Sequence, residues 1–272
     1  MHVELTLIGM GTGHPDHMTR QGVVALQEAD LVLLPRKGEE KAALAAVRQQ
    51  ICEQWLSGSG VRLAWFDMPE RQPAQALADY RLAVQRWHDA IANAWYEALC
   101  RHLSGGGRVA MLVWGDPSLY DSTLRIAERL SQRISLRTRV VPGITALQAL
   151  TAAHAVALNE INEPVFITTG RWLRDHGWPQ QADTVAVMLD GQASFLTLPP
   201  DGITIWWGAY LGMAHELLAH GSLADVGPVI AMQRQQARAR HGWIMDTYLM
   251  RRTRAHPVDT RPIGPSEKTW NS

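Results

Sequence analysis

Residues 3–15, with the sequence VELTLIGMGTGHP, decide the fold of this chain. Residues 3–9 are a short, apolar, β-rich run that ends in a glycine cluster, which is typical of a buried parallel strand. Residues 19–29 then carry apolar side chains at helical spacing, and residues 31–34 form a second apolar run. This order predicts a β-α-β unit at the start of the chain.

The same alternation continues along the first half of the chain. After a triple glycine, residues 108–114 read as a strand, and so do residues 136–141. We expect helices at residues 39–55, 74–103, 122–131 and 145–155, with an irregular stretch between the first two. Strands that alternate with helices indicate an α/β fold with a doubly wound parallel sheet.

After residue 158 the pattern becomes richer in strands, and only residues 214–219 read clearly as a helix. The strand-like segments are residues 165–169, 184–189, 203–207, 229–233 and 243–250. We therefore expect two α/β lobes, an N-terminal lobe at 1–157 and a strand-rich lobe with a mixed sheet at 158–252. The proline-containing tail, residues 253–272, is expected to be extended or disordered.

Charge and cysteine content exclude several classes of protein. Lys+Arg and Asp+Glu both number 26, so the formal net charge is zero and nothing in the total charge favours nucleic acid or a membrane surface as a partner. No apolar run approaches the roughly 20 residues of a membrane span. Cys52 and Cys100 have no metal-ligand spacing, so we expect no metal site and a reduced, cytoplasmic protein.

The glycine loop at residues 9–15 invites comparison with a dinucleotide site, but the fingerprint fails. The third glycine of GxGxxG would fall at His14, and Pro15 follows directly. Asp30 precedes the second strand, whereas a ribose-binding acid would follow its end. A nucleotide-dependent oxidoreductase is therefore disfavoured, and the glycines could equally form a sharp turn alone.

Two further strand ends carry similar corners. GDPSLY, residues 115–120, follows the strand at 108–114, and VVPGITA, residues 140–146, follows the strand at 136–141. In open α/β sheets ligands gather at the carboxyl ends of the strands. The three corners together predict one pocket.

The motifs GxGxGxP, GDPxxY and VPGITA, in this order, resemble those of the tetrapyrrole methyltransferase family, and the resemblance extends to about Arg252. It implies two α/β lobes that clasp S-adenosylmethionine, usually in a homodimer. It places the glycine loop, with Gly11, Thr12, Gly13 and Pro15, on the tetrapyrrole side. It assigns the cofactor to Gly115, Asp116, Ser118, Tyr120, Ile144, Thr145 and Ala146, and in the second lobe to Met188, Leu189, Gly208, Ala209, Tyr210 and Ala237.

Four segments look most like one branch of that family. They are WGDPSLYDST (114–123), LPRKGEEK (34–41), YRLAVQRWHDAI (80–91) and IWWGAYLG (205–212). This branch methylates carbon 1 of precorrin-5, a cobalamin precursor, and releases its acetyl group as acetate. Thr12-Gly13-His14 departs from the usual family loop. The alternatives are another precorrin methyltransferase of the family and a non-catalytic tetrapyrrole carrier.

The chemistry implied by the resemblance makes few demands on side chains. Methyl transfer is an in-line displacement that depends on positioning and a dry cleft, so Asp116 is expected to bind and not to act as a nucleophile. Loss of acetate needs water added to a ketone, and His14, Asp16 and Thr19 are the candidate groups. For the substrate carboxylates, Arg36, Lys37 and Lys41 form a candidate clamp; the alternative is a solvated helix start.

Overall fold

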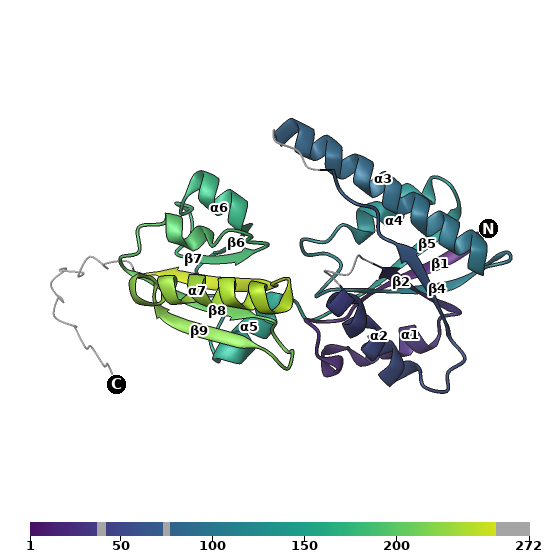
Figure 1. The fold of residues 1–272 in the computed structure, drawn as a ribbon, viewed down its shortest axis with the longest axis horizontal. Helices are drawn as coiled ribbons and strands as arrows, with labels where there is room; N and C mark the ends of the chain where they lie inside the picture. Colours follow the sequence, from purple (N-terminus) through teal and green to yellow (C-terminus); the bar gives the residue numbers. More distant parts are fainter. Residues whose placement is uncertain (37–41, 73–76, 254–272) are drawn as a thin grey trace, which may run out of the picture.

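The computed structural model describes residues 1–36, 42–72 and 77–253, which form two α/β lobes joined side by side (Figure 1). Each lobe has its own five-stranded sheet. The predicted fold class is confirmed, including the parallel sheet of the first lobe and the mixed sheet of the second.

The first lobe contains a wholly parallel sheet in the order β3-β2-β4-β1-β5. Its carboxyl edge faces the second lobe (Figure 1). The elements are β1 (His2–Gly9), η1 (Pro15–His17), α1 (Arg20–Gln27), β2 (Leu31–Arg36), α2 (Ala42–Leu56), β3 (Arg62–Asp67), α3 (Leu77–His102), β4 (Gly106–Val113), α4 (Thr123–Ser131) and β5 (Ser135–Val141).

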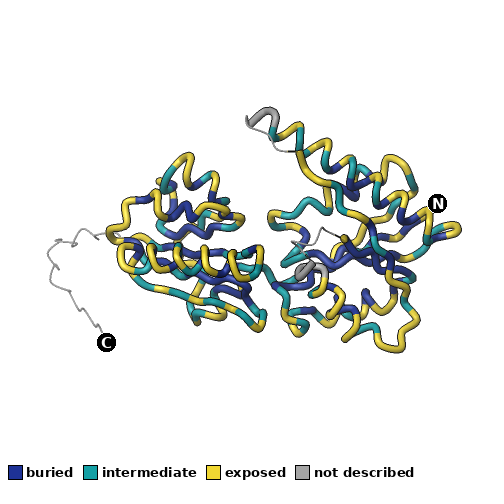
Figure 2. Tube along the Cα trace, in the orientation of Figure 1, coloured by how far each residue is buried: buried dark blue, intermediate teal, exposed yellow. Residues whose placement is uncertain are grey.

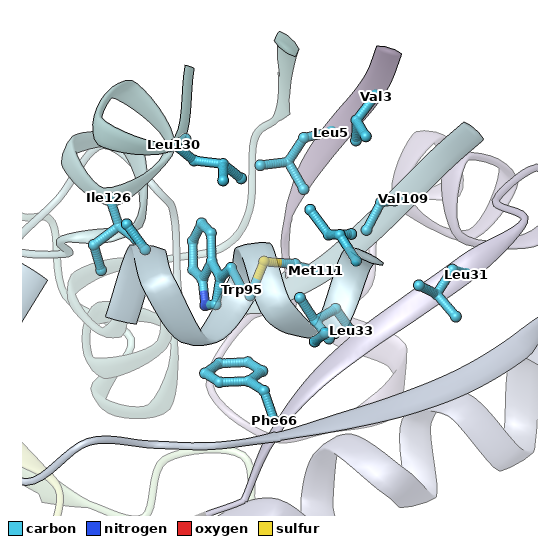
Figure 3. Close-up of a cluster of buried hydrophobic side chains, with 14 of the residues drawn as sticks. Val3, Leu5, Leu31, Leu33, Phe66, Trp95, Val109, Met111, Ile126 and Leu130 are labelled. Carbon is cyan, nitrogen blue, oxygen red and sulfur yellow. The ribbon is translucent and has the colours of Figure 1, made fainter. Parts of the chain in front are cut away.

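Helices cover both faces of this sheet, because its central strands are apolar on both sides. One face packs against α3 and α4 around Trp95, Ile126 and Leu130 (Figure 3). The other face packs against α1 and α2, where Leu26 and Ile51 are fully buried. The strands are thus fixed firmly enough for the loops at their ends to hold a defined shape.

The second lobe contains a mixed sheet in the order β6-β7-β10-β8-β9. Its neighbouring strands β6 and β7 pair in parallel, and the other neighbouring strands pair antiparallel. One face is covered by α6, α7 and η3, and the other by α5. The elements are α5 (Ala146–His154), β6 (Val165–Thr169), α6 (Gly170–His176), β7 (Thr184–Met188), η3 (Ser194–Thr197), β8 (Ile203–Ala209), β9 (Leu217–Ser222), α7 (Leu223–His241) and β10 (Asp246–Arg252).

Several element predictions were wrong. The stretch between the first two long helices contains β3, an edge strand of the first sheet, and α6 was not predicted. Residues 229–233 lie within α7, not in a strand, because the buried side chains of that helix recur with helical period at Leu223, Gly227, Ile230, Arg234 and Ala237. Residues 214–219 are not a helix, since β9 begins at Leu217 and pairs with β8.

Helix α5 connects the two lobes. It follows β5 of the first sheet, but its apolar side packs on the second sheet, with Leu147 and Leu150 against Ala186 and Leu249. The boundary expected at residue 157 lies after this helix, whereas the packing puts α5 with the second lobe. Buried residues accordingly fall into two groups, one along each sheet (Figure 2). The tail expected to be disordered lies, from residue 254 on, outside the described residues.

Candidate functional site between the lobes

Three glycine corners meet at the carboxyl edge of the first sheet. Gly9 and Gly143 touch so closely that a Cβ on Gly143 would lie 2.2 Å from the Gly115 carbonyl oxygen and 2.6 Å from the Gly9 Cα. Gly11 and Gly115 form an isolated antiparallel bridge, in which the Gly115 amide donates to the Gly11 carbonyl at 2.8 Å. The three loops predicted from sequence therefore come together through their backbones.

Asp116 ties two of these corners to each other. Its Oδ1 accepts hydrogen bonds from the Ser118 amide, at 2.8 Å, and from the Ser118 hydroxyl, while Oδ2 accepts from the Gly143 amide at 2.9 Å. Partial burial raises the pKa of Asp116, but the hydrogen bonds from Ser118 and Gly143 outweigh it and bring the pKa below its usual value. The ionised carboxylate thus has a structural partner on each oxygen.

The second lobe contributes a largely apolar wall. Leu189, after β7, and Tyr210, after β8, both have left-handed backbone conformations, with φ of 55° and 52°. Leu189 is 66% exposed, whereas Tyr210 is buried and donates from its hydroxyl to the Trp243 carbonyl at 2.5 Å. The Tyr210 amide also donates to the Met245 carbonyl at 2.9 Å, which fixes the ends of β8 and β10 together.

A pocket lies between these two sets of loops and contains about 760 Å³ of space, including the part open to solvent. Tyr120, on its rim, crosses to the second lobe, where its hydroxyl donates to the Ile167 carbonyl at 3.1 Å. The lining residues are Gly11, Thr12, Trp114, Gly115, Asp116, Leu119, Tyr120, Thr145, Ala146, Met188, Leu189, Tyr210, Leu211, Met245, Asp246 and Thr247.

The structure therefore brings together many of the residues singled out from sequence. Eight of the residues expected at the cofactor line this pocket, and Gly11 and Thr12, expected on the substrate side, line it as well. The eight are Gly115, Asp116, Tyr120, Thr145, Ala146, Met188, Leu189 and Tyr210.

Five other residues expected at the cofactor do not line the pocket. Ser118 is a hydrogen-bond partner of Asp116, and the carbonyl of Ile144 lies near Gly115. Gly208 and Ala209 are buried at the end of β8, where Gly208 packs against Leu150 and Leu211. Ala237 is buried in the core of the second lobe, on α7.

Sequence reasoning missed a buried polar network beneath the pocket. Arg234 on α7 forms an ion pair with Asp246 at 2.6 Å, and both side chains are less than a tenth exposed. Asp246 also accepts from the Trp207 indole at 2.7 Å, and Arg234 donates to the Asp190 carbonyl. Asp190 in turn accepts from the Tyr248 hydroxyl at 2.7 Å. The sequence signal for this network was the position of Asp190 and Asp246, which are acidic residues at the ends of apolar strand segments.

The first loop places its polar side chains differently from expectation. Thr19 caps α1 by accepting from the Gly22 amide at 3.0 Å, and His14 caps η1, with Pro15 next in that turn, by accepting from the Asp16 amide at 3.1 Å. None of the three candidate catalytic residues, nor Pro15 or Gly13, lines the pocket. Gly13 adopts φ of 121° beside Trp114 and Met213.

His17, which sequence reasoning passed over, is the first-loop histidine with a bond to the pocket wall. Its Nδ1 lies 3.0 Å from the hydroxyl of Thr12. Burial, and then the neighbouring His14, lower the pKa of His17, while Asp16 and Glu216 oppose them.

The predicted carboxylate clamp is only partly described. Arg36 is exposed at the end of β2, with its guanidinium 3.7 Å from Asp67, and Lys37 and Lys41 lie outside the described residues. Asp30 lies at the opposite edge of the sheet, where it accepts from the Arg108 amide at 2.8 Å. It is therefore remote from the pocket at the carboxyl edge, which further disfavours a nucleotide-dependent oxidoreductase.

In the part of the chain that the structure describes, no group of three or more His, Cys, Asp or Glu side chains is arranged to hold a metal ion. No helix there is long and apolar enough to cross a membrane.

Comparison with known proteins assigns the family. The sequence model for "Tetrapyrrole (Corrin/Porphyrin) Methylases" matches residues 4–227, which include all three glycine corners. The chain belongs to the tetrapyrrole methylase family. The two lobes with a pocket between them are thus the expected framework of a methylase of this family.

Individual relatives extend this result. The chain is 42% identical to the precorrin-6A synthase [deacetylating] of Sinorhizobium sp over 251 residues, which cover 92% of this chain and 95% of that protein. It is 27% identical to a precorrin-2 C(20)-methyltransferase of Sinorhizobium sp, over 67% of this chain and 71% of the relative.

Solved structures of family members agree with the fold. A cobalamin synthesis related protein (CobF) of Corynebacterium diphtheriae superposes with a TM-score of 0.76 and 35% identity, over 93% of this chain and 99% of that one. A uroporphyrin-III C-methyl transferase of Thermus thermophilus, complexed with S-adenyl homocysteine, superposes with a TM-score of 0.55 over 91% of both chains. At 17% identity, this second likeness concerns the fold alone.

Proposed function

We propose that this protein is an S-adenosylmethionine-dependent methyltransferase of cobalamin biosynthesis, which converts precorrin-5 to precorrin-6A and releases acetate. The similarity to the Sinorhizobium precorrin-6A synthase carries this proposal, because it extends over nearly the full length of both proteins. The order of the three corner motifs supports the family, and the segments at 34–41, 80–91, 114–123 and 205–212 support this branch of it. Another precorrin methyltransferase of the family is the alternative.

We assign S-adenosylmethionine to the pocket between the lobes. Its apolar wall, which includes Leu119, Leu211 and Met245, suits an adenine ring, and the glycine corners leave room for backbone to approach a polar tail. The cofactor residues expected from the resemblance remain our assignment, with Gly115, Asp116 and Thr145 on the first-lobe side. We add Leu211, Met245 and Thr247 from the second lobe.

The chain's own residues act by position and by exclusion of water. Bound S-adenosylmethionine supplies a methyl group activated by a positively charged sulfur. The apolar wall keeps water from that group, and the corners fix its direction. In the substrate, water adds to the acetyl carbonyl and the bond from that carbon to the ring breaks. Acetate then leaves, the electron pair of the broken bond stays with the ring, and the methyl group would pass to ring carbon 1 as its bond to sulfur breaks, with S-adenosylhomocysteine as the second product.

The hydrolytic step needs a group that accepts a proton from water. His14, Asp16 and Thr19 stay predictions for this role, although Thr19 and His14 also cap helices. We add His17, because Thr12 links it to the pocket wall and because its lowered pKa favours the neutral, proton-accepting imidazole.

The first test is binding of S-adenosylhomocysteine by calorimetry, for the wild type and for Asp116→Ala. Loss of the carboxylate removes hydrogen bonds to an ionised acceptor at two corners, so affinity should fall about tenfold or more. The exposed Asp201→Ala is the matched control and should bind like the wild type.

The outcome decides between an enzyme and a carrier. If the wild type binds the cofactor, acetate release from precorrin-5 can be assayed directly, and acetate without methyl transfer would contradict the proposed reaction. If the wild type does not bind it, the methyltransferase proposal fails and a tetrapyrrole carrier becomes the better interpretation.

We also propose a cytoplasmic homodimer. The free thiols of Cys52 and Cys100 fit a reducing compartment, and the dimer follows from the family resemblance. Light scattering of the purified protein tests the dimer.

A further inference from the structure

A cluster of arginine and aromatic side chains spans the two lobes, between α3 of the first and α6 of the second. The Arg171 guanidinium of α6 lies 4.6 Å from the ring centre of Tyr80 on α3. Arg71 lies 5.3 Å from the same ring and 5.8 Å from the ring of Trp87, and its Nη1 donates to the Tyr80 hydroxyl at 3.4 Å. We call Arg71, Tyr80, Trp87 and Arg171 the mouth cluster.

The mouth cluster lies on the same side of both sheets as the pocket. Arg71 follows the carboxyl end of β3, in a segment whose Met68 amide donates to the Arg36 carbonyl at 2.9 Å. Arg171 follows the carboxyl end of β6, where Thr169 pairs with the pocket residue Met188. In addition, the residue before Arg171 packs directly against Asp190, the neighbour of Leu189 in the pocket wall. Both arginines therefore follow strands whose carboxyl ends lie at the same sheet edges as the pocket loops.

Among the residues whose side chains the structure describes, the two arginines of this cluster have no acidic counterpart, since no carboxylate there lies within ion-pair distance of Arg71 or Arg171. By contrast, Arg174, one turn along α6, lies 3.5 Å from Asp175 and donates to Gln192 at 2.8 Å. Two exposed guanidinium groups held by one ring repel each other, and an anion between them would relieve that repulsion.

We propose that Arg71 and Arg171 bind a carboxylate side chain of the tetrapyrrole substrate, with Tyr80 as the platform that holds them in place. This inference rests on the proposed function, because precorrins carry several carboxylate side chains. Guanidinium groups grip carboxylates through paired hydrogen bonds, and the aromatic contacts limit the freedom that each arginine loses on binding. The subsite also draws on both lobes, so the substrate would hold them together.

The test uses porphyrin titrations in place of the unstable precorrin. Uroporphyrin III, with carboxylates on all its side chains, is titrated by tryptophan fluorescence into the wild type, Arg71→Ala, Arg171→Ala and the control Arg174→Ala. Coproporphyrin III, with fewer carboxylates, is the second probe. Binding of S-adenosylhomocysteine is measured in parallel by calorimetry.

We expect Arg71→Ala and Arg171→Ala each to weaken uroporphyrin binding about tenfold and to flatten its dependence on salt. Coproporphyrin should lose less affinity. Binding of S-adenosylhomocysteine should stay unchanged, and Arg174→Ala should behave as the wild type does.

Three results would overturn the subsite. The first is that Arg71→Ala and Arg171→Ala both bind porphyrin as tightly as the wild type does, and the second is that the wild type binds no uroporphyrin. The third is an equal loss of porphyrin and S-adenosylhomocysteine binding in the variants, which would mean that the cluster only holds the two lobes together. The proposed function fails separately, if the wild type binds no S-adenosylhomocysteine. Porphyrin effects seen in that case would still support the subsite.

Discussion

His17 is held between loops of different lobes. Its Nδ1 faces the Thr12 hydroxyl of the first lobe, and a Cβ on Gly212 of the second would lie only 2.7 Å from its ring. Glycine at position 212, with φ of 76°, leaves room for the imidazole. The environment of the His17 side chain therefore depends on the contact between the two lobes.

This placement predicts a pH dependence of stability. Burial, followed by the nearby His14, lowers the pKa of His17 from its usual 6.5. As the pH falls through that value, the unfolded chain takes up a proton that the folded one does not, so the free energy of unfolding falls, by up to about 1.4 kcal/mol per pH unit. The loss ends once the pH passes below the folded pKa.

We expect His17→Gln to remove this contribution. Urea denaturation between pH 7.5 and 5.5 should show a smaller loss of unfolding free energy in the variant than in the wild type. His2→Gln, at the far end of the first sheet, tests whether loss of any histidine changes the profile. Parallel curves for the wild type and His17→Gln would contradict the prediction.

At the scale of elements, the three corners work as one backbone unit. Gly143→Ala would push a methyl group into the Gly115 carbonyl and against the backbone of Gly9, so that main-chain atoms would have to shift. We expect the free energy of unfolding to fall by about 3 kcal/mol and cofactor affinity to fall with it.

Gly191→Ala is the matched control for this variant. Residue 191 also lies beside the pocket, but nothing lies within 4 Å of its added Cβ. Thermal unfolding and calorimetric titration of both variants check the prediction. Equal stability of the two would mean that the close backbone contact is not needed.

The first-lobe corners could be predicted from sequence because each lies within a few residues of a strand end and carries its own glycine motif. The second-lobe wall could not, since Leu211 and Met245 are brought together by antiparallel pairing of β8 and β10, which no local pattern reports. Similarly, the apolar run at 229–233 resembles a strand, and only the longer period from Leu223 to Ala237 reveals a helix.

At the scale of the whole molecule, two cores share one pocket. Each lobe buries its own apolar clusters, and α5 belongs by packing to the second although its cap, Thr145, lines the pocket. The Tyr120 hydroxyl crosses the gap to Ile167. A ligand in the pocket therefore contacts both lobes at once.

We expect S-adenosylhomocysteine to couple the unfolding of the lobes. In scanning calorimetry without ligand, the van't Hoff enthalpy should be smaller than the calorimetric enthalpy, which indicates that the lobes unfold in part separately. At about 100 times its Kd, the ligand should add about 2.7 kcal/mol and bring the two enthalpies together. Asp116→Ala should need more ligand for the same effect. A ligand that raises the Tm but leaves the ratio of the van't Hoff enthalpy to the calorimetric enthalpy unchanged would contradict this coupling.

The contact of Gly9, Gly115 and Gly143 has an evolutionary consequence. A corner made of touching backbones leaves selection little to vary, so descendants of a duplicated gene would inherit the pocket between the lobes nearly intact. The exposed side chains at the mouth, such as Arg71 and Arg171, can drift without disturbing it. New enzymes for successive intermediates of one macrocycle could thus arise by changes in these exposed side chains, while the backbone of the pocket stays as it was.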